Sequence, residues 1–122
     1  MTLQELYQDI GGSYDQAVRI MRMDKLIDKH IRKFTKNGVV ENLLNAGQAM
    51  DPTALFEAAH ALKGVSANLG LTALSDAASE ITEEYRPGAQ RRLSDEQVRE
   101  KLGKLEALYH EIAKKIEQYD AC

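Results

Sequence analysis

Apolar residues recur at spacings of three and four along almost the whole chain of 122 residues, and this periodicity constrains the fold more than any other feature. No stretch of useful length alternates apolar and polar residues as a half-buried strand would. The longest apolar stripe keeps a heptad spacing for about six turns near the C-terminus, which is typical of a seam between packed helices. Its members are Val98, Leu102, Leu105, Tyr109, Ile112, Ile116 and Tyr119. The pattern predicts an all-α fold.

Capping residues and helix breakers divide this pattern into separate helices. The predicted N-caps are Thr2, Ser13, Asp51, Thr72 and Ser94. Gly11–Gly12 ends the first helix, and Pro52 after Asp51 is a start signal for the longest helix of the middle region. The predicted helices cover about 3–10, 13–21, 24–36, 40–47, 52–69, 72–85 and 95–119.

Amphipathic helices with short connections favour an antiparallel four-helix bundle with additional short N-terminal helices. A chain of 122 residues fits one domain and can bury a core without disulfides or metal. We therefore expect a single domain over residues 1–122, with the short N-terminal helices at about 2–21 and the bundle at about 24–119.

The composition argues against several classes of function. A net charge of −3, a pI near 5.6 and the absence of Trp disfavour a nucleic-acid partner, because phosphate backbones select basic surfaces and bases stack on aromatic rings. No apolar run approaches the roughly 20 residues that span a bilayer, and the N-terminus does not resemble a signal peptide. The one cysteine, Cys122, has no partner for a disulfide or a zinc site. We expect a cytoplasmic monomer without a membrane or nucleic-acid partner.

The segment from 55 to 70 carries the most informative surface of the chain. A helical projection places one set of residues on the core side: Leu55, Ala58, Ala59, Leu62, Val65, Ser66 and Leu69. His60 falls on the opposite side, surrounded by Phe56, Lys63, Gly64 and Ala67. A mid-helix glycine costs roughly 1 kcal/mol relative to alanine, and core packing does not explain one that points outward. Close approach by another molecule does, and Phe56 and Ala67 would give it an apolar landing surface.

The chemistry of these residue types fits a phosphoryl carrier. The unperturbed pKa of an imidazole is about 6.5, so the neutral and nucleophilic form predominates near pH 7. A phosphoryl group on the ring brings close to two negative charges. Lys63 is adjacent to His60 on the helix surface and can offset that charge.

This segment resembles the histidine-containing phosphotransfer (HPt) domains. Their hallmark is His, any residue, an apolar residue, Lys and Gly, followed by small residues and a further Gly. The chain supplies this pattern in register at His60, Leu62, Lys63, Gly64, Ala67 and Gly70. The resemblance extends over most of the chain and implies a free-standing HPt protein with a four-helix bundle.

The resemblance also implies a phosphorelay function. His60 would accept a phosphoryl group, at the ring nitrogen remote from the backbone, from an aspartyl phosphate on a receiver domain of a response regulator or hybrid kinase. It would then pass the group to the aspartate of another receiver. Lys63 would give electrostatic support and Gly64 steric clearance. The Mg²⁺ of this chemistry belongs to the receiver, so we expect no cofactor and no metal site in this chain.

Further residues are candidates around the same site. Phe56, Ala67 and Asn68 are expected to border the receiver-docking surface. His30 has two interpretations, as a rim of that surface or as a half-buried packing residue, and we favour packing. In some members of the family a Gln on the neighbouring helix hydrogen-bonds the imidazole. Thr82 takes that position here, and its shorter side chain leaves the contact open.

Three other functions compete with this interpretation. Glu57 and His60 form a Glu-x-x-His element like those of di-iron bundles, but neither His30 nor His110 has a Glu three residues before it. A bundle that serves as a docking or scaffold module without phosphotransfer is the second alternative, and the intact His-Lys-Gly set argues against it. The chain has no length for an ATP-binding kinase domain, so we expect a phosphate carrier rather than a stand-alone enzyme.

The remaining polar residues are predicted to have structural or solvent-facing roles. His110 is expected on the solvated side of the last helix. Glu83–Glu84 and the segment 90–92 are interpreted as solvated charges at a helix end and in a loop. Ser66 is expected to bond its own helix backbone.

Overall fold

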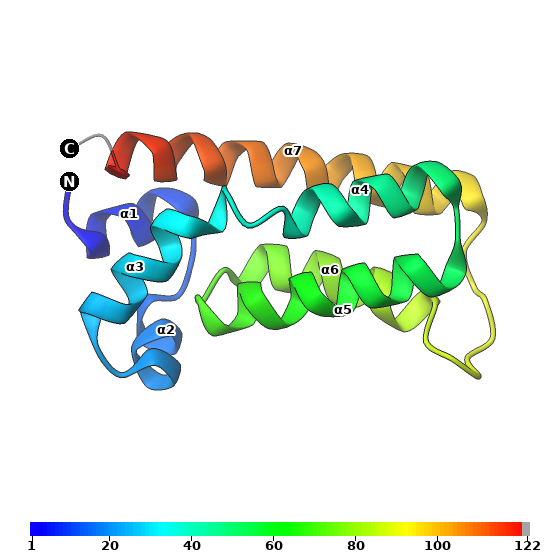
Figure 1. Ribbon diagram of the computed structural model, residues 1–122, viewed down its shortest axis with the longest axis horizontal. Helices are drawn as coiled ribbons and strands as arrows, with labels where there is room; N and C mark the ends of the chain where they lie inside the picture. The colour runs from blue at the N-terminus through cyan, green and yellow to red at the C-terminus, as the bar shows by residue number, and fades with distance from the viewer. Residues whose placement is uncertain (121–122) are drawn as a thin grey trace.

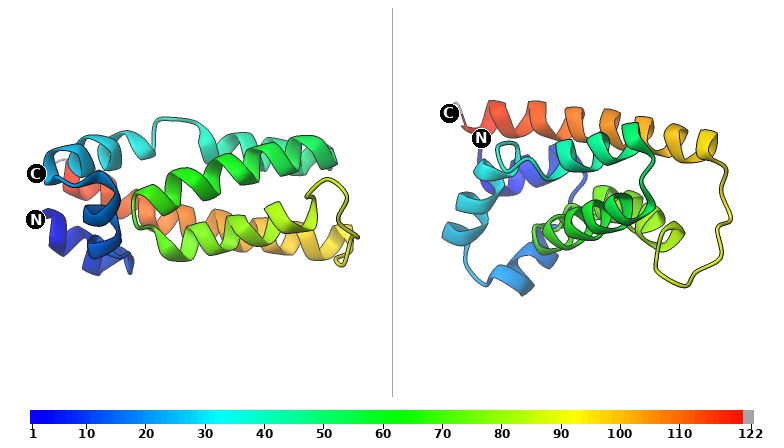
Figure 2. Two further views of the ribbon diagram at one scale, coloured as in Figure 1. Left: turned by 90° about the horizontal axis from the view of Figure 1, so that it is seen from below. Right: turned by 45° about the vertical axis from the view of Figure 1, so that its right-hand side comes forward.

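The computed structural model describes residues 1–120, which form seven α-helices and no strand (Figure 1). The helices are α1 (Leu3–Ile10), α2 (Tyr14–Met21), α3 (Asp24–Phe34), α4 (Val39–Ala49), α5 (Pro52–Asn68), α6 (Thr72–Glu84) and α7 (Asp95–Asp120). Helices α4 to α7 run antiparallel along the long axis, and α1 to α3 gather at one end of this bundle (Figures 1 and 2). The predicted all-α bundle with short N-terminal helices is confirmed. Cys122 lies outside the described residues.

Two capping boxes start helices where the sequence predicts them. At α1, the Glu5 N–H donates to Thr2 Oγ1 at 3.1 Å and the Thr2 N–H donates to Glu5 Oε1 at 2.9 Å. At α7, the Gln97 N–H donates to Ser94 Oγ at 3.1 Å and the Ser94 N–H to Gln97 Oε1 at 2.9 Å. Each box satisfies two backbone donors that the first turn leaves unpaired. Most other helix ends agree with the prediction to within about two residues.

The predicted cap at Thr72 is wrong. Helix α6 begins at Thr72 itself, and Leu71 holds the N-cap position without a side-chain hydrogen bond. The Thr72 hydroxyl donates instead to the Gly70 carbonyl at 3.3 Å. The side chain of Leu71 is buried in the core, so burial of this leucine, rather than capping, determines where the helix starts.

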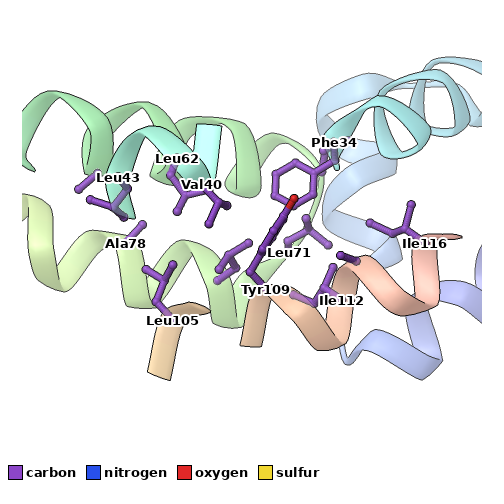
Figure 3. Packing of buried hydrophobic residues seen from close by; sticks show 14 of the residues in the cluster. Phe34, Val40, Leu43, Leu62, Leu71, Ala78, Leu105, Tyr109, Ile112 and Ile116 are labelled. Atoms are coloured by element: carbon purple, nitrogen blue, oxygen red, sulfur yellow. The ribbon is translucent and has the colours of Figure 1, made fainter. Parts of the chain in front are cut away.

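The core lies between α4, α5, α6 and α7 and continues under the N-terminal helices (Figure 3). All seven members of the predicted C-terminal stripe are buried along α7. Fully burying a Leu or Ile side chain contributes about 1.5–3 kcal/mol. Side chains from several helices meet there, among them Phe34, Val40, Leu43, Leu62, Leu71, Ala78, Leu105, Tyr109 and Ile112. This shared core holds α5 firmly on one side.

The C-terminal end of α5 is fixed by a close backbone crossing. Gly70 has φ +69° and accepts a hydrogen bond from the Ser13 N–H at 2.8 Å. A Cβ at position 70 would lie 2.2 Å from the Ser13 carbonyl oxygen. Only glycine combines a left-handed φ with so close an approach at low cost. The crossing therefore requires Gly70.

Two side chains from the N-terminal helices strengthen this end of α5. The buried Tyr7 hydroxyl donates to the Leu69 carbonyl at 2.5 Å, and burial raises the pKa of Tyr7. The Gln16 Nε2 group donates to the Ala67 carbonyl at 2.9 Å. The first bond satisfies the carbonyl at the C-cap of α5, and the second adds to the hydrogen bond that the Ala67 carbonyl accepts from the Gly70 N–H at 3.1 Å. The end of α5 is thus held by α1 and α2 as well as by the bundle.

The charges around the end of α6 are not all solvated, contrary to the sequence interpretation. The Glu84 side chain is 4% exposed, and its Oε2 accepts from Arg91 Nε at 2.6 Å. The same carboxylate accepts from the backbone N–H groups of Arg92 and Leu93, each at 3.0 Å. Burial raises the pKa of Glu84, but these hydrogen bonds outweigh it and hold the pKa below its usual value. Glu84 therefore organises the loop that leads into α7.

Candidate functional site

Helix α5 turns one side to the core and the other to solvent, as the helical projection predicts. Its buried residues include Leu55, Ala59, Leu62 and Ser66, and Ala58 and Val65 are half-buried. His60 lies on the opposite side and is exposed. The Ser66 hydroxyl donates to the Leu62 carbonyl within the same helix, which confirms the predicted role of Ser66. The helix thus presents the imidazole to solvent on a backbone that the core holds in place.

Phe56 lies against the imidazole. The two ring centroids are 5.7 Å apart and the ring planes differ by 12°, which is a stacked arrangement. Phe56 is half-buried and packs on the hydrophobic core. Because Phe56 is anchored in this way, its ring restricts the orientations open to His60. The predicted apolar neighbour of His60 is therefore also a support for its ring.

Arg86 is a neighbour that the sequence reasoning missed. Its guanidinium carbon lies 5.7 Å from the Phe56 ring centroid, and its Nη2 lies 2.7 Å from Glu83 Oε1. The antiparallel pairing of α5 and α6 brings Arg86 to this place. The Ser75 hydroxyl marks that pairing by donating to the Lys63 carbonyl at 3.3 Å. The register between two helices cannot be read from either helix alone.

Lys63 is half-buried and forms no ion pair with any of residues 1–120. The carboxylate of Glu83 lies close enough for the charge of Lys63 to affect its pKa. The hydrogen bond from Arg86 lowers the pKa of Glu83, and the charge of Lys63 acts in the same direction. Arg86 therefore forms the ion pair with this carboxylate, and Lys63 keeps no ion-pair partner within residues 1–120.

The space beyond His60 is open. Gly64 is exposed, and a Cβ built at this position would have nothing within 4 Å apart from its own helix turn. By contrast, a Cβ at Gly47 would lie 2.5 Å from Leu102 Cδ1, so packing between α4 and α7 explains that glycine. No neighbour within the described part of the chain explains Gly64.

Of the other predicted site residues, Ala67 and Asn68 lie on the same helix as His60, whereas His30 and Thr82 lie on α3 and α6. Ala67 is half-buried and Asn68 is exposed, both on the last turn of α5. His30 is exposed on α3, so the favoured interpretation of half-buried packing is wrong. The reason is that Ile27 and Ile31 fill the buried side of α3, and His30 lies off that side. Thr82 is fully buried, and its hydroxyl donates to the Ala78 carbonyl at 2.9 Å rather than to the imidazole.

Residues 1–120 give no structural support for a metal-dependent bundle site. Within residues 1–120, no group of three or more His, Cys, Asp or Glu side chains is arranged to hold a metal ion. His110 is exposed, as predicted, and its Nε2 lies 3.7 Å from Glu106 Oε2. Among residues 1–120, no helix is both long and apolar enough to cross a membrane.

A family model described as the Hpt domain matches residues 35–120, which include all four bundle helices and the surface around His60. No curated protein and no solved structure matches the chain.

Proposed function

Because this chain belongs to the Hpt domain family, whose members carry phosphoryl groups on histidine in phosphorelays, we propose that His60 is its phosphorylated residue. One observation carries the assignment. Of the three histidines, His60 alone stands on the bundle face where a mid-helix glycine, Gly64, leaves open space one turn away. His30 and His110 are also exposed, but neither has such a neighbour on its own helix at that spacing.

In the proposed reaction, the lone pair of the neutral imidazole Nε2 attacks the phosphorus of an aspartyl phosphate on a receiver domain. A nitrogen–phosphorus bond forms, and the bond from phosphorus to the aspartate oxygen breaks. The electron pair leaves with the aspartate, which becomes a free carboxylate, and Nδ1 keeps its proton. Transfer to the aspartate of a second receiver is the reverse of these steps. The chain needs no metal of its own, because Mg²⁺ is expected on the receiver.

The neighbours of His60 have distinct proposed roles in this transfer. The stacked ring of Phe56 limits rotation of the imidazole, so less orientational freedom is lost on reaching the transition state. The Lys63 ammonium offsets the negative charge that the phosphoryl group brings. The open space at Gly64 lets the receiver approach until its aspartyl phosphate reaches Nε2. Ala67 and Asn68 border the docking surface.

Transfer of acid-labile phosphate from a panel of phosphorylated receiver domains tests this proposal. We expect wild-type protein to be labelled and His60→Gln to take no label. His110→Gln is the matched control, because His110 is also exposed but lies on α7, and it should be labelled normally. Lys63→Ala should be labelled about tenfold more slowly, since one charge interaction of about 1.4 kcal/mol is lost in the transition state.

The same experiment separates the proposal from its alternative. A docking or scaffold module would bind receivers and take no phosphate from any of them. Labelling of His60→Gln at the wild-type rate would contradict the assignment of His60. The choice of receivers, the direction of phosphoryl flow, a domain extent of 1–122 and a cytoplasmic location stay predictions from the sequence.

A further inference from the structure

The corner formed by α2, α3 and the turn between them exposes large apolar side chains. Ile20 is 44% exposed, Met23 is 53% exposed and Leu26 is 37% exposed. Three of the four exposed large apolar residues of the described chain therefore fall within seven consecutive positions. Single exposed apolar residues are ordinary on a protein surface, but a cluster marks an interaction site. We name residues 19–36 the basic corner.

The charge of the basic corner is opposite to that of the rest of the chain. Residues 19–36 contain seven Lys and Arg residues and two Asp residues, a net charge of +5. The whole chain carries −3, so the other residues together carry −8. Such an asymmetry produces a strong local field and steers charged partners towards one end of the molecule.

Most of this positive charge has no ion-pair partner within residues 1–120. Arg32 pairs with Asp28 and Asp120, and Lys36 pairs with Asp120. The other five cations form no ion pair with any residue from 1 to 120: Arg19, Arg22, Lys25, Lys29 and Lys33. The side chain of Asp24, the second acid of the corner, accepts a hydrogen bond from the Tyr14 hydroxyl. The basic corner is therefore available for an acidic partner.

The basic corner lies next to the surface around His60. The Gln16 side chain donates to the Ala67 carbonyl at 2.9 Å, so α2 meets the last turns of α5 (Figures 1 and 2). Ile20 follows Gln16 by one turn on the same side of α2. On α5, Ala67 follows His60 by two turns along the same face. One partner of domain size therefore reaches both His60 and Ile20.

We propose that the basic corner is a second contact for the receiver that docks on His60, and that it selects receivers whose docking face carries an apolar patch with an acidic rim. This inference rests on the proposed function. Ile20, Met23 and Leu26 would meet the apolar patch, and the five unpaired cations would meet the acidic rim. A receiver is favoured over an anionic membrane because a bilayer against this corner would cover the Ala67 end of α5 and obstruct access to His60.

Charge contacts at a rim act mainly on the rate of association. We expect Lys25→Glu/Lys29→Glu to lower kcat/KM for transfer from an acidic-rimmed receiver by about tenfold or more at low salt. The difference should shrink at 0.5 M salt, where the field is screened within a few ångströms. A receiver without acidic residues on its docking face should respond little to the substitutions.

The matched control is Arg99→Glu/Lys104→Glu, which changes the net charge equally on the N-terminal half of α7, the half that points away from α1 to α3 (Figure 1). It should transfer at the wild-type rate. A second variant, Ile20→Ser/Met23→Ser, tests the apolar contact and should slow transfer at both salt concentrations. Circular dichroism and the fraction of His60 finally labelled should match wild type in all variants.

The outcomes are distinguishable. Equal rates for the corner and control variants, with His60 labelled normally, would overturn the role of the basic corner and leave the proposed function standing. If no receiver labels wild-type protein, both proposals are overturned. Binding of wild-type protein to phosphatidylserine vesicles, lost in the corner variant while its transfer is unchanged, would assign the corner to membranes and contradict our inference.

Discussion

Gly64 and Gly70 lie close together in the sequence, on α5 and on the turn that follows it, yet their surroundings are opposite. At Gly70 the chain has a left-handed φ, and a Cβ would lie 2.2 Å from the backbone oxygen of Ser13. At Gly64 the helix is regular and exposed, and a Cβ would have nothing within 4 Å beyond its own helix turn. Gly70 is required by atoms of this chain, whereas no atom of residues 1–120 requires Gly64.

The comparison separates a folding constraint from a functional one. Gly70 allows the N-terminal helices to cross the end of α5, and that crossing fixes the helix that carries His60. Gly64 lowers helix stability and relieves no contact within residues 1–120. A destabilising residue without an internal reason is best explained by a partner that needs the space. Substitutions at the two glycines test each half of this comparison.

The largest effect is expected from Gly70→Ala. The added methyl combines the cost of a left-handed φ, about 1 kcal/mol, with a collision against a backbone oxygen that cannot move aside. We expect the free energy of unfolding to fall by about 3 kcal/mol or more, measured by urea denaturation.

Gly88→Ala is the control for that substitution. Gly88 has φ +85°, but a Cβ there would have nothing within 4 Å, so only the backbone cost of about 1 kcal/mol applies. If the two variants lose equal stability, the close crossing at Ser13 does not constrain the fold, and this half of the comparison fails.

Gly64→Glu tests the other half. The variant should keep its folding stability to within about 1 kcal/mol, because Glu favours helix and the site is open. A bulky acid over the imidazole should block the receiver and its phosphoryl group, with transfer about a hundredfold slower, equivalent to about 2.7 kcal/mol.

Gly103→Glu is the matched control. Gly103 is an exposed glycine within α7, a Cβ there also has nothing within 4 Å, and α7 does not carry His60. This control should fold and transfer normally. Normal transfer by Gly64→Glu would show that no partner needs the space one turn beyond His60.

The helix pattern and the exposed side of α5 could be predicted from the sequence because both follow from spacing within one segment. His60, Lys63 and Gly64 all lie on one helix, so a projection of that helix was sufficient. Arg86 was missed because its place beside Phe56 depends on the register between α5 and α6. Contacts between helices are set by packing, which local periodicity does not specify.

The same limit explains two of the other errors. The sequence predicts a solvated Glu84 because acidic residues at helix ends usually face solvent. Instead, hydrogen-bond donors from the following loop surround its carboxylate, and the side chain is buried. Thr72 was expected to cap α6 because its residue type suits that role, but the buried Leu71 shifts the start of the helix. His30 was expected to be half-buried, although the apolar set of α3 leaves it facing solvent. For Glu84 and Thr72, a tertiary contact outweighed a residue-type preference, whereas the exposure of His30 follows from the positions of Ile27 and Ile31 on its own helix.

The smallest effect is expected from Gly64→Ala, which should raise the stability of the fold and lower the rate of transfer. Gly64→Ala should raise the free energy of unfolding by about 0.5–1 kcal/mol, since alanine is the better helix former and its methyl meets no other atom. Transfer should slow by a few-fold if the receiver packs closely there. Gly103→Ala should give the same stabilisation with transfer unchanged, which isolates the effect of location from that of helix propensity. A loss of stability in Gly64→Ala, measured beside Gly103→Ala by urea denaturation, would mean that this chain itself needs the glycine, and the contrast with Gly70 would disappear.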